Sequence, residues 1–162
     1  MTRLIEFVIA LALVLALFLV IGLILPSSRE LQESVETNRR MTIVFDTLNN
    51  VRRLKDWNPL IPSAANELSY SGGENESGVG AKVDFNSANP AWGQGSWEIT
   101  ESEKNKLVSI AIEDPTKGHD KKTSFTLEPT GKGGRNVKIT QDYSIKYGWN
   151  LFGRYAGLYV SR

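Results

Sequence analysis

The feature that most constrains this chain is an alternation of apolar and polar residues at period two between residues 93 and 147. Successive side chains of a strand point to opposite faces of a sheet, so the pattern predicts four strands with one buried and one solvated face. Such one-sided sheets are antiparallel. The apolar parity carries Trp97, Ile99, Val108, Ile110, Ile112, Phe125, Leu127, Val137, Ile139, Tyr143 and Ile145. The opposite parity, expected to face solvent, carries Ser96, Glu98, Thr100, Ser109, Glu113, Thr126, Glu128, Lys138, Asp142 and Lys146.

Length and composition limit the class of protein. The 162 residues allow one domain and an appendage. Lysine, arginine, aspartate and glutamate are interspersed and leave a net charge of +1, so we expect no nucleic-acid partner, which would require a basic face. Cysteine is absent, which excludes disulfides, thiolate chemistry and cysteine-ligated zinc.

The N-terminal segment predicts a membrane anchor. Residues 7–25 contain no charge, and a helix of that length spans roughly 28 Å, close to the hydrocarbon core of a bilayer. A signal peptide is the competing interpretation, but its apolar core is usually about 7 to 15 residues and ends at a small-x-small site, which Ile24-Leu25-Pro26-Ser27 lacks. A buried helix is the third alternative. We predict an anchor over residues 4–26 and a folded domain over residues 27–162.

The charges beside the anchor bear on its orientation. Arg3 and the amino terminus lie on one side, and Arg29, Arg39 and Arg40 lie on the other. Arg39 and Arg40 are assigned to the folded domain and are not counted. Arg3 and the amino terminus then outnumber Arg29 on the other side, which favours a cytoplasmic amino terminus. We therefore expect a single-pass membrane protein whose domain is extracytoplasmic.

The remaining elements follow from periodicity and from Gly and Pro. We predict a polar first strand over residues 29–37, in which Leu31, Val35 and Thr37 share a face. Spacings of three and four residues predict a helix with the apolar stripe Met41, Val44, Phe45, Leu48 and Val51. A second short turn covers residues 51–57 and is ended by Pro59. Further strands are expected over residues 68–71 and around Val83 and Phe85, with glycines 93 and 95 allowing a bulge or a close backbone approach. A helical stripe runs from Leu151 to the end of the chain.

Several short motifs occur in an order that points to a known family. They are Trp57-Asn58-Pro59, Gly78-Val79-Gly80, Gly93-Gln94-Gly95-Ser96-Trp97, Val137-Lys138-Ile139 and residues 153–158, preceded by Leu25-Pro26-Ser27 at the end of the apolar segment. In this respect residues 26–162 resemble the polyketide cyclase/dehydrase-like branch of the START-like (SRPBCC) superfamily. The resemblance implies an α+β helix-grip fold, in which an antiparallel sheet with two short helices encloses a cavity against a C-terminal helix. It also implies an apolar small molecule or lipid as ligand, and it does not imply a reaction.

The chain departs from the family at its C-terminal helix. About 13 residues remain for this helix, or some 20 Å, where members have six or more turns. If several hundred Å² of sheet were uncovered, the forfeited burial would amount to about 10 kcal/mol. We therefore expect a ligand, the bilayer, or a partner chain, such as a second copy in a homodimer, to cover the gap.

Inward-facing residues are the candidates for ligand contact. The predicted pocket residues are Trp57, Phe85, Trp97, Ile99, Ile110, Thr123, Phe125, Gln141 and Tyr143. Other interpretations stay open: Trp57 can lock a helix-loop corner, the aromatic residues can be plain core, and a shifted parity would leave Thr123 and Gln141 in solvent.

The sequence predicts no catalytic constellation, no metal site and no cofactor. The one histidine, His119, falls in an expected loop of charged residues, and no Ser/His/Asp set can be built around it. Three functions remain: a membrane-tethered module that binds an apolar ligand, a cyclase or dehydratase using an inward group such as Tyr143, and an interaction or scaffold protein. The first fits the residues best, since the inward parity carries tyrosines but no carboxylate or histidine.

Overall fold

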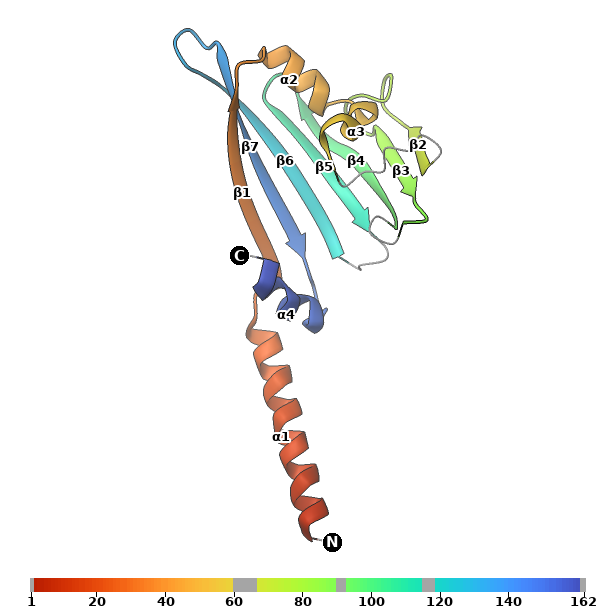
Figure 1. Ribbon diagram of the computed structural model, residues 1–162, viewed down its shortest axis with the longest axis vertical. Helices are drawn as coiled ribbons and strands as arrows, with labels where there is room; N and C mark the ends of the chain where they lie inside the picture. Colours follow the sequence, from red (N-terminus) through yellow and green to blue (C-terminus); the bar gives the residue numbers. More distant parts are fainter. Residues whose placement is uncertain (1, 60–66, 90–92, 115–118, 161–162) are drawn as a thin grey trace. The chain divides into compact units, whose positions relative to one another are not determined.

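Seven antiparallel strands form one sheet, in the order β1-β7-β6-β5-β4-β3-β2 (Figure 1). The computed structural model describes residues 2–59, 67–89, 93–114 and 119–160. The strands are β1 (Ser28–Thr37), β2 (Leu68–Ser71), β3 (Lys82–Asn86), β4 (Gln94–Glu103), β5 (Leu107–Asp114), β6 (His119–Thr130) and β7 (Asn136–Lys146). The meander predicted between residues 93 and 147 is therefore confirmed, and so is the α+β class.

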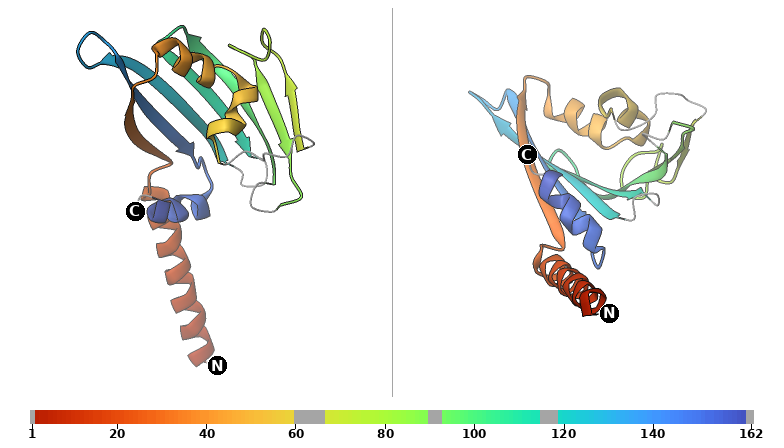
Figure 2. Two further views of the ribbon diagram at one scale, coloured as in Figure 1. Left: turned by 45° about the horizontal axis from the view of Figure 1, so that its top comes forward. Right: turned by 60° about the horizontal axis from the view of Figure 1, so that its bottom comes forward.

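Two short helices and a 3-10 turn cover one face of this sheet, here called the inner face (Figure 2). They are α2 (Met41–Leu48), η1 (Val51–Arg53) and α3 (Leu54–Trp57). The stripe predicted for α2 is confirmed, because Val44, Phe45 and Leu48 are buried. They pack against a core whose sheet members are Val83, Phe85, Trp97, Ile99, Val108, Ile110, Ile112, Phe125, Leu127 and Val137.

A close backbone approach occurs at Gly95, as its position before the β4 alternation predicts. A Cβ built at Gly95 would lie 2.7 Å from Cζ of Phe85 and 2.5 Å from the carbonyl oxygen of Glu113. Gly95 pairs with Phe85 across β3 and β4. The missing side chain therefore leaves room for the Phe85 ring within the core.

A β-bulge occurs further along β4, where the register of the β4–β5 pair shifts between Ile99 and Glu101. Ile99 pairs with Ile110, and Glu101 pairs with Ser109, so Thr100 is the extra residue. A bulge leaves one residue unpaired and resets the alternation. The reset turns Glu101 to the outer face and Ser102 to the inner face, where its hydroxyl donates to Oδ1 of Asn49 at 2.7 Å.

Two expectations about solvent exposure are wrong. Ser96 and Ser109 lie on the polar parity but are buried. The Ser109 hydroxyl donates to Oε2 of Glu101 at 2.8 Å and lies 2.9 Å from the Ser124 hydroxyl, while Ser96 donates to Glu113 at 3.3 Å. Their short side chains are covered by longer neighbours on the outer face. The expected loop position of His119 is also wrong, because β6 begins at His119. Lys121 of β6 forms an ion pair with Asp114 at 3.3 Å.

Glu101 gives a pH-dependent prediction. Hydrogen bonds from Ser109 and then Lys122, together with the Lys122 charge, hold the pKa of Glu101 below its ordinary value of 4.5. A depressed folded-state pKa stabilises the fold above the unfolded value and loses that contribution as the pH falls through the folded value. We expect Glu101→Gln to flatten the loss of thermal stability below about pH 4.5. Glu128→Gln, at an exposed carboxylate without a hydrogen-bond partner in the described part of the chain, is the control. An equal flattening in both variants would contradict the assignment.

The chain divides into two units. The sheet unit, residues 30–145, contains α2, η1, α3 and nearly all of the sheet. The helix unit contains α1 (Thr2–Ile24) and α4 (Leu151–Val160), with the start of β1 and the end of β7. α1 is long and apolar enough over Arg3–Ile24 to cross a bilayer, a property that signal sequences and core helices share. The anchor and domain boundaries at 4–26 and 27–162 stay a prediction, and the predicted end at Arg162 lies outside the described residues.

Candidate functional site

A cavity of about 760 Å³ lies on the inner face of the sheet unit, between β1, the helices and strands β6 and β7. Its volume falls within the range of about 300–1,000 Å³ that is typical of small-molecule sites. Most of its exposed lining is apolar. The residues that line it are Glu33, Ser34, Val35, Thr37, Arg39, Ile43, Val44, Thr47, Leu48, Arg53, Trp57, Phe125, Ile139 and Gln141. The expected cavity against the C-terminal helix is thus not this one, because none of the described α4 residues is among its lining.

Helix α2 forms one wall of the cavity. Val44 and Leu48 are buried in the core and also border the cavity, and Ile43 borders it as well and is 46% exposed. The Thr47 hydroxyl donates to the carbonyl oxygen of Ile43 at 2.7 Å, so this hydroxyl is occupied within the helix. The wall that α2 presents is therefore mainly aliphatic.

Strands β6 and β7 form the floor, and a polar pair lies in it. Gln141 Nε2 donates to Oγ1 of the buried Thr123 at 3.0 Å. This bond fixes the amide and satisfies the hydroxyl, which would otherwise be a costly unpaired group. Phe125 and Ile139 supply apolar surface beside it.

Trp57, the last residue of α3, also lines the cavity. Its ring meets Phe125 edge to face, with 5.4 Å between the ring centroids. Its Nε1 is buried, and it has no hydrogen-bond partner among the residues that the structure describes. Leaving a buried donor unpaired costs about 1–3 kcal/mol.

Three charged residues border the cavity: Glu33, Arg39 and Arg53. Within the described ranges, neither guanidinium group forms an ion pair with a carboxylate. A guanidinium stays charged at any relevant pH and presents a fork of donors suited to carboxylate or phosphate. The cavity thus combines an apolar wall with two arginines and one glutamate.

The predicted pocket residues fall into three groups. Trp57, Phe125 and Gln141 line the cavity, and Thr123 lies directly beneath Gln141. Trp97, Ile99 and Ile110 are buried in the packed core and are not among the cavity residues. Phe85 and Tyr143 border two other grooves.

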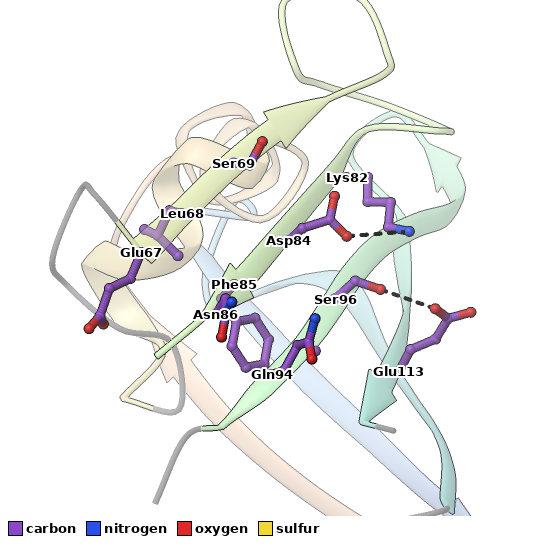
Figure 3. A pocket seen from close by; sticks show the side chains of 11 residues that line it. Glu67, Leu68, Ser69, Lys82, Asp84, Phe85, Asn86, Gln94, Ser96 and Glu113 are labelled. Carbon is purple, nitrogen blue, oxygen red and sulfur yellow. Dashed lines mark hydrogen bonds and ion pairs between the residues drawn. The ribbon is translucent and has the colours of Figure 1, made fainter. Parts of the chain in front are cut away.

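The groove beside Phe85 is polar (Figure 3). It measures about 450 Å³, and its charged residues are Glu67, Lys82, Asp84 and Glu113. Lys82 Nζ lies 3.4 Å from Oδ1 of Asp84, and the Ser96 hydroxyl donates to Glu113. The groove beside Tyr143, of about 470 Å³, includes a bond of 2.6 Å from Gln32 to Asp142. In the described part of the chain, no three His, Cys, Asp or Glu residues are grouped to hold a metal.

Sequence reasoning missed much of the cavity wall. The sequence predicts that Val35 and Thr37 share a face of β1, and both line the cavity. The polar composition of β1 does not indicate that this face borders a cavity. Ile43 falls outside the buried stripe of α2, and an apolar residue beside such a stripe is the signal that could have found it. Arg39 and Arg53 carried no sequence signal for this role.

Comparison with known proteins gives the fold. No protein-family model and no curated protein matches the chain. Norcoclaurine synthase from Thalictrum flavum, in complex with dopamine and hydroxybenzaldehyde, is similar with a TM-score of 0.60 and 14% identity, over 85% of this chain and 80% of that one. The major latex-like protein 151 of Panax ginseng is similar with a TM-score of 0.54 and 12% identity, over 84% of this chain and 93% of that one. A Mesorhizobium loti protein is similar with a TM-score of 0.51 and 17% identity, over 80% of this chain and 85% of that one. At these identities the likeness shows the fold alone, and the chain has an α+β fold of the START-like, helix-grip type.

Proposed function

We propose that this protein is a membrane-tethered module that binds an apolar or lipid-like molecule in the inner-face cavity of its sheet unit. The observation that carries the proposal is the cavity itself, about 760 Å³ with mainly apolar lining. Apolar pockets with a few convergent polar groups are the usual form of small-molecule sites. Norcoclaurine synthase, which is similar in fold, is in complex with dopamine and hydroxybenzaldehyde, and this supports small-molecule binding by a chain of this fold.

Polar groups of the cavity define the class of ligand further. The aliphatic and aromatic walls bury the body of the molecule, which is favourable by about 25 cal/mol per Å² of apolar surface. Arg39 and Arg53 line the cavity, and a guanidinium suits an acidic end of the ligand. An amphipathic acid, such as a fatty acid, meets both requirements.

The tether is the second part of the proposal. Arg3–Ile24 is long and apolar enough to cross a bilayer, and an uncleaved α1 would hold the sheet unit at the membrane surface. A tether raises the local concentration of a ligand that partitions into lipid. We place the sheet unit on the extracytoplasmic side, as the balance of charges beside α1 indicates.

A cyclase-like reaction is the activity that the family resemblance raises as an alternative. Tyr143 is the inward tyrosine that such a reaction could use. It packs against the core and borders the groove of about 470 Å³ described above, and it is not one of the cavity residues. Binding rather than catalysis is therefore the function that this arrangement supports better.

Native mass spectrometry of the full chain, purified in a mild detergent from a membrane-containing host, tests the proposal. We expect a monomer with a discrete adduct of lipid-like mass, or one that takes up oleic acid stoichiometrically when it is added. Uptake by a monomer would also speak against a partner chain filling this site. A chain that carries no adduct and takes up no oleic acid would overturn the binding function.

A further inference from the structure

Helix α4 and the last turns of α1 pack tightly against each other within the helix unit. Gly22 makes the approach possible, because a Cβ built there would lie 3.2 Å from Cδ2 of Leu151 and 3.2 Å from Cε2 of Tyr155. The Tyr155 ring stacks on Phe18 with 4.3 Å between centroids, and its hydroxyl donates to the carbonyl oxygen of Phe18 at 2.6 Å. The two helices are thus held together by packing and by a specific hydrogen bond.

Arg154 ties α4 to the C-terminal end of α1. Its Nη1 donates to the carbonyl oxygens of Gly22, Leu23 and Leu25 at 3.3, 3.2 and 3.3 Å. The last carbonyl groups of a helix lack partners within the helix and carry partial negative charge. A guanidinium here donates hydrogen bonds to these carbonyl groups and places a positive charge beside them. Arg154 also donates to the carbonyl oxygen of Gly148 at 2.6 Å. The single charge of α4 is therefore used on backbone groups.

The packing sets the depth of α4 if α1 crosses a bilayer. The 22 residues of Arg3–Ile24 are about 33 Å long as a helix, close to the hydrocarbon thickness of about 30 Å. The α1 residues that α4 contacts, from Phe18 to Leu23, lie in the last two turns of this span, and Leu25 follows directly after it. They would lie at the boundary between acyl chains and headgroups, and α4 would lie there with them.

The surface that α4 leaves open suits this boundary. Trp149, just before the helix, is 85% exposed, and Phe152 is 77% exposed. Ala156, one turn beyond Phe152, is exposed as well. Tryptophan and other aromatic residues are enriched where a membrane meets water, because their rings are apolar and their polar tips can stay wet. An exposed apolar face without a charge fits a helix that lies in the plane of the interface.

We propose that α4 is an interfacial helix, with Trp149 and Phe152 inserted among lipid headgroups and upper acyl chains. The partner of this surface is the bilayer itself. The proposal rests on the tether in the proposed function, but it does not depend on a ligand in the cavity. The C-terminal segment then adds a second membrane contact beside α1 and restrains the base of the helix unit.

Single-cysteine labelling tests the proposal, because the natural chain has no cysteine. An environment-sensitive fluorophore is attached to the full chain in nanodiscs at one of four sites. Phe152→Cys and Ala156→Cys report on α4, Leu13→Cys on the middle of α1, and Lys132→Cys on the exposed hairpin loop of the sheet unit. Quenching is measured with lipids that carry a nitroxide near the headgroup or deep in the acyl chain, and with aqueous iodide.

We expect the α4 labels to be quenched most by the shallow nitroxide, with blue-shifted emission and reduced iodide quenching relative to the Lys132→Cys label. The Leu13→Cys label should respond most to the deep nitroxide. If Leu13→Cys is deep while both α4 labels are as accessible to iodide as Lys132→Cys, the interfacial helix is wrong and the tether stands. If the Leu13→Cys label is itself in water, the tether fails and the interfacial helix fails with it. Two α4 sites guard against a variant that does not fold.

Discussion

Replacing Ile110 with alanine lowers the free energy of unfolding by about 2–5 kcal/mol. Ile110 lies on β5, pairs with Ile99 on one side and Thr123 on the other, and is 0% exposed. The loss combines the transfer of the removed carbons to water with the cavity left among rigid neighbours. Since small domains are stable by only about 5–15 kcal/mol, this single change removes a large fraction of the total. Urea unfolding of the detergent-solubilised full chain, followed by tryptophan fluorescence, measures the change.

Ile43→Ala is the matched control for Ile110→Ala. The same atoms are removed, but Ile43 borders the cavity and is nearly half exposed. We expect a loss of about 1 kcal/mol, because less apolar surface is withdrawn from water there. Equal losses at the two sites would mean that the inner-face core is not where the structure places it.

Replacing Ile43 with tryptophan lowers ligand occupancy at least about tenfold, which corresponds to about 1.4 kcal/mol of binding free energy. The Ile43 side chain borders the cavity on α2, so the larger indole ring occupies volume that the ligand needs. The fold should tolerate the change because Ile43 is outside the packed core. Native mass spectrometry of the full chain measures occupancy from the ratio of adduct to bare monomer.

Thr42→Trp controls for the general effect of an added tryptophan on α2. Thr42 is the preceding residue of the same helix, is exposed, and is not among the residues that line the cavity. We expect its occupancy to equal that of the wild type. Equal loss in both variants, or no loss in Ile43→Trp, would show that the adduct does not occupy this cavity.

The strands and helices could be predicted because their signal is local. Alternation such as Val108, Ile110 and Ile112, and the stripe of Val44, Phe45 and Leu48, report directly which side of an element is buried. The bulge at Thr100 could not be placed in this way. Thr100 and Glu101 are both polar, so the apolar pattern is the same whichever residue is extra.

The site was predicted less completely, because a cavity depends on what several elements leave unfilled. Parity placed Ile99 and Gln141 on the same inner face, but only the packing of α2, α3 and β1 separates core from cavity wall. The pairing of α4 with α1 is also beyond a local signal. It depends on Gly22 lying opposite Leu151 and on Arg154 reaching the end of α1, contacts between residues more than a hundred positions apart.

Photo-crosslinking of a diazirine fatty acid to the full chain in nanodiscs, followed by peptide mapping, tests the central claim most directly. The account predicts crosslinks on the peptides that carry Val35, Ile43 to Leu48, and Ile139, and their loss in Ile43→Trp but not in Thr42→Trp. Crosslinks to α1 are expected in every variant, because a membrane span contacts lipid. Crosslinks confined to α1 and α4, with the sheet unit unlabelled, would contradict a ligand-binding cavity on the inner face.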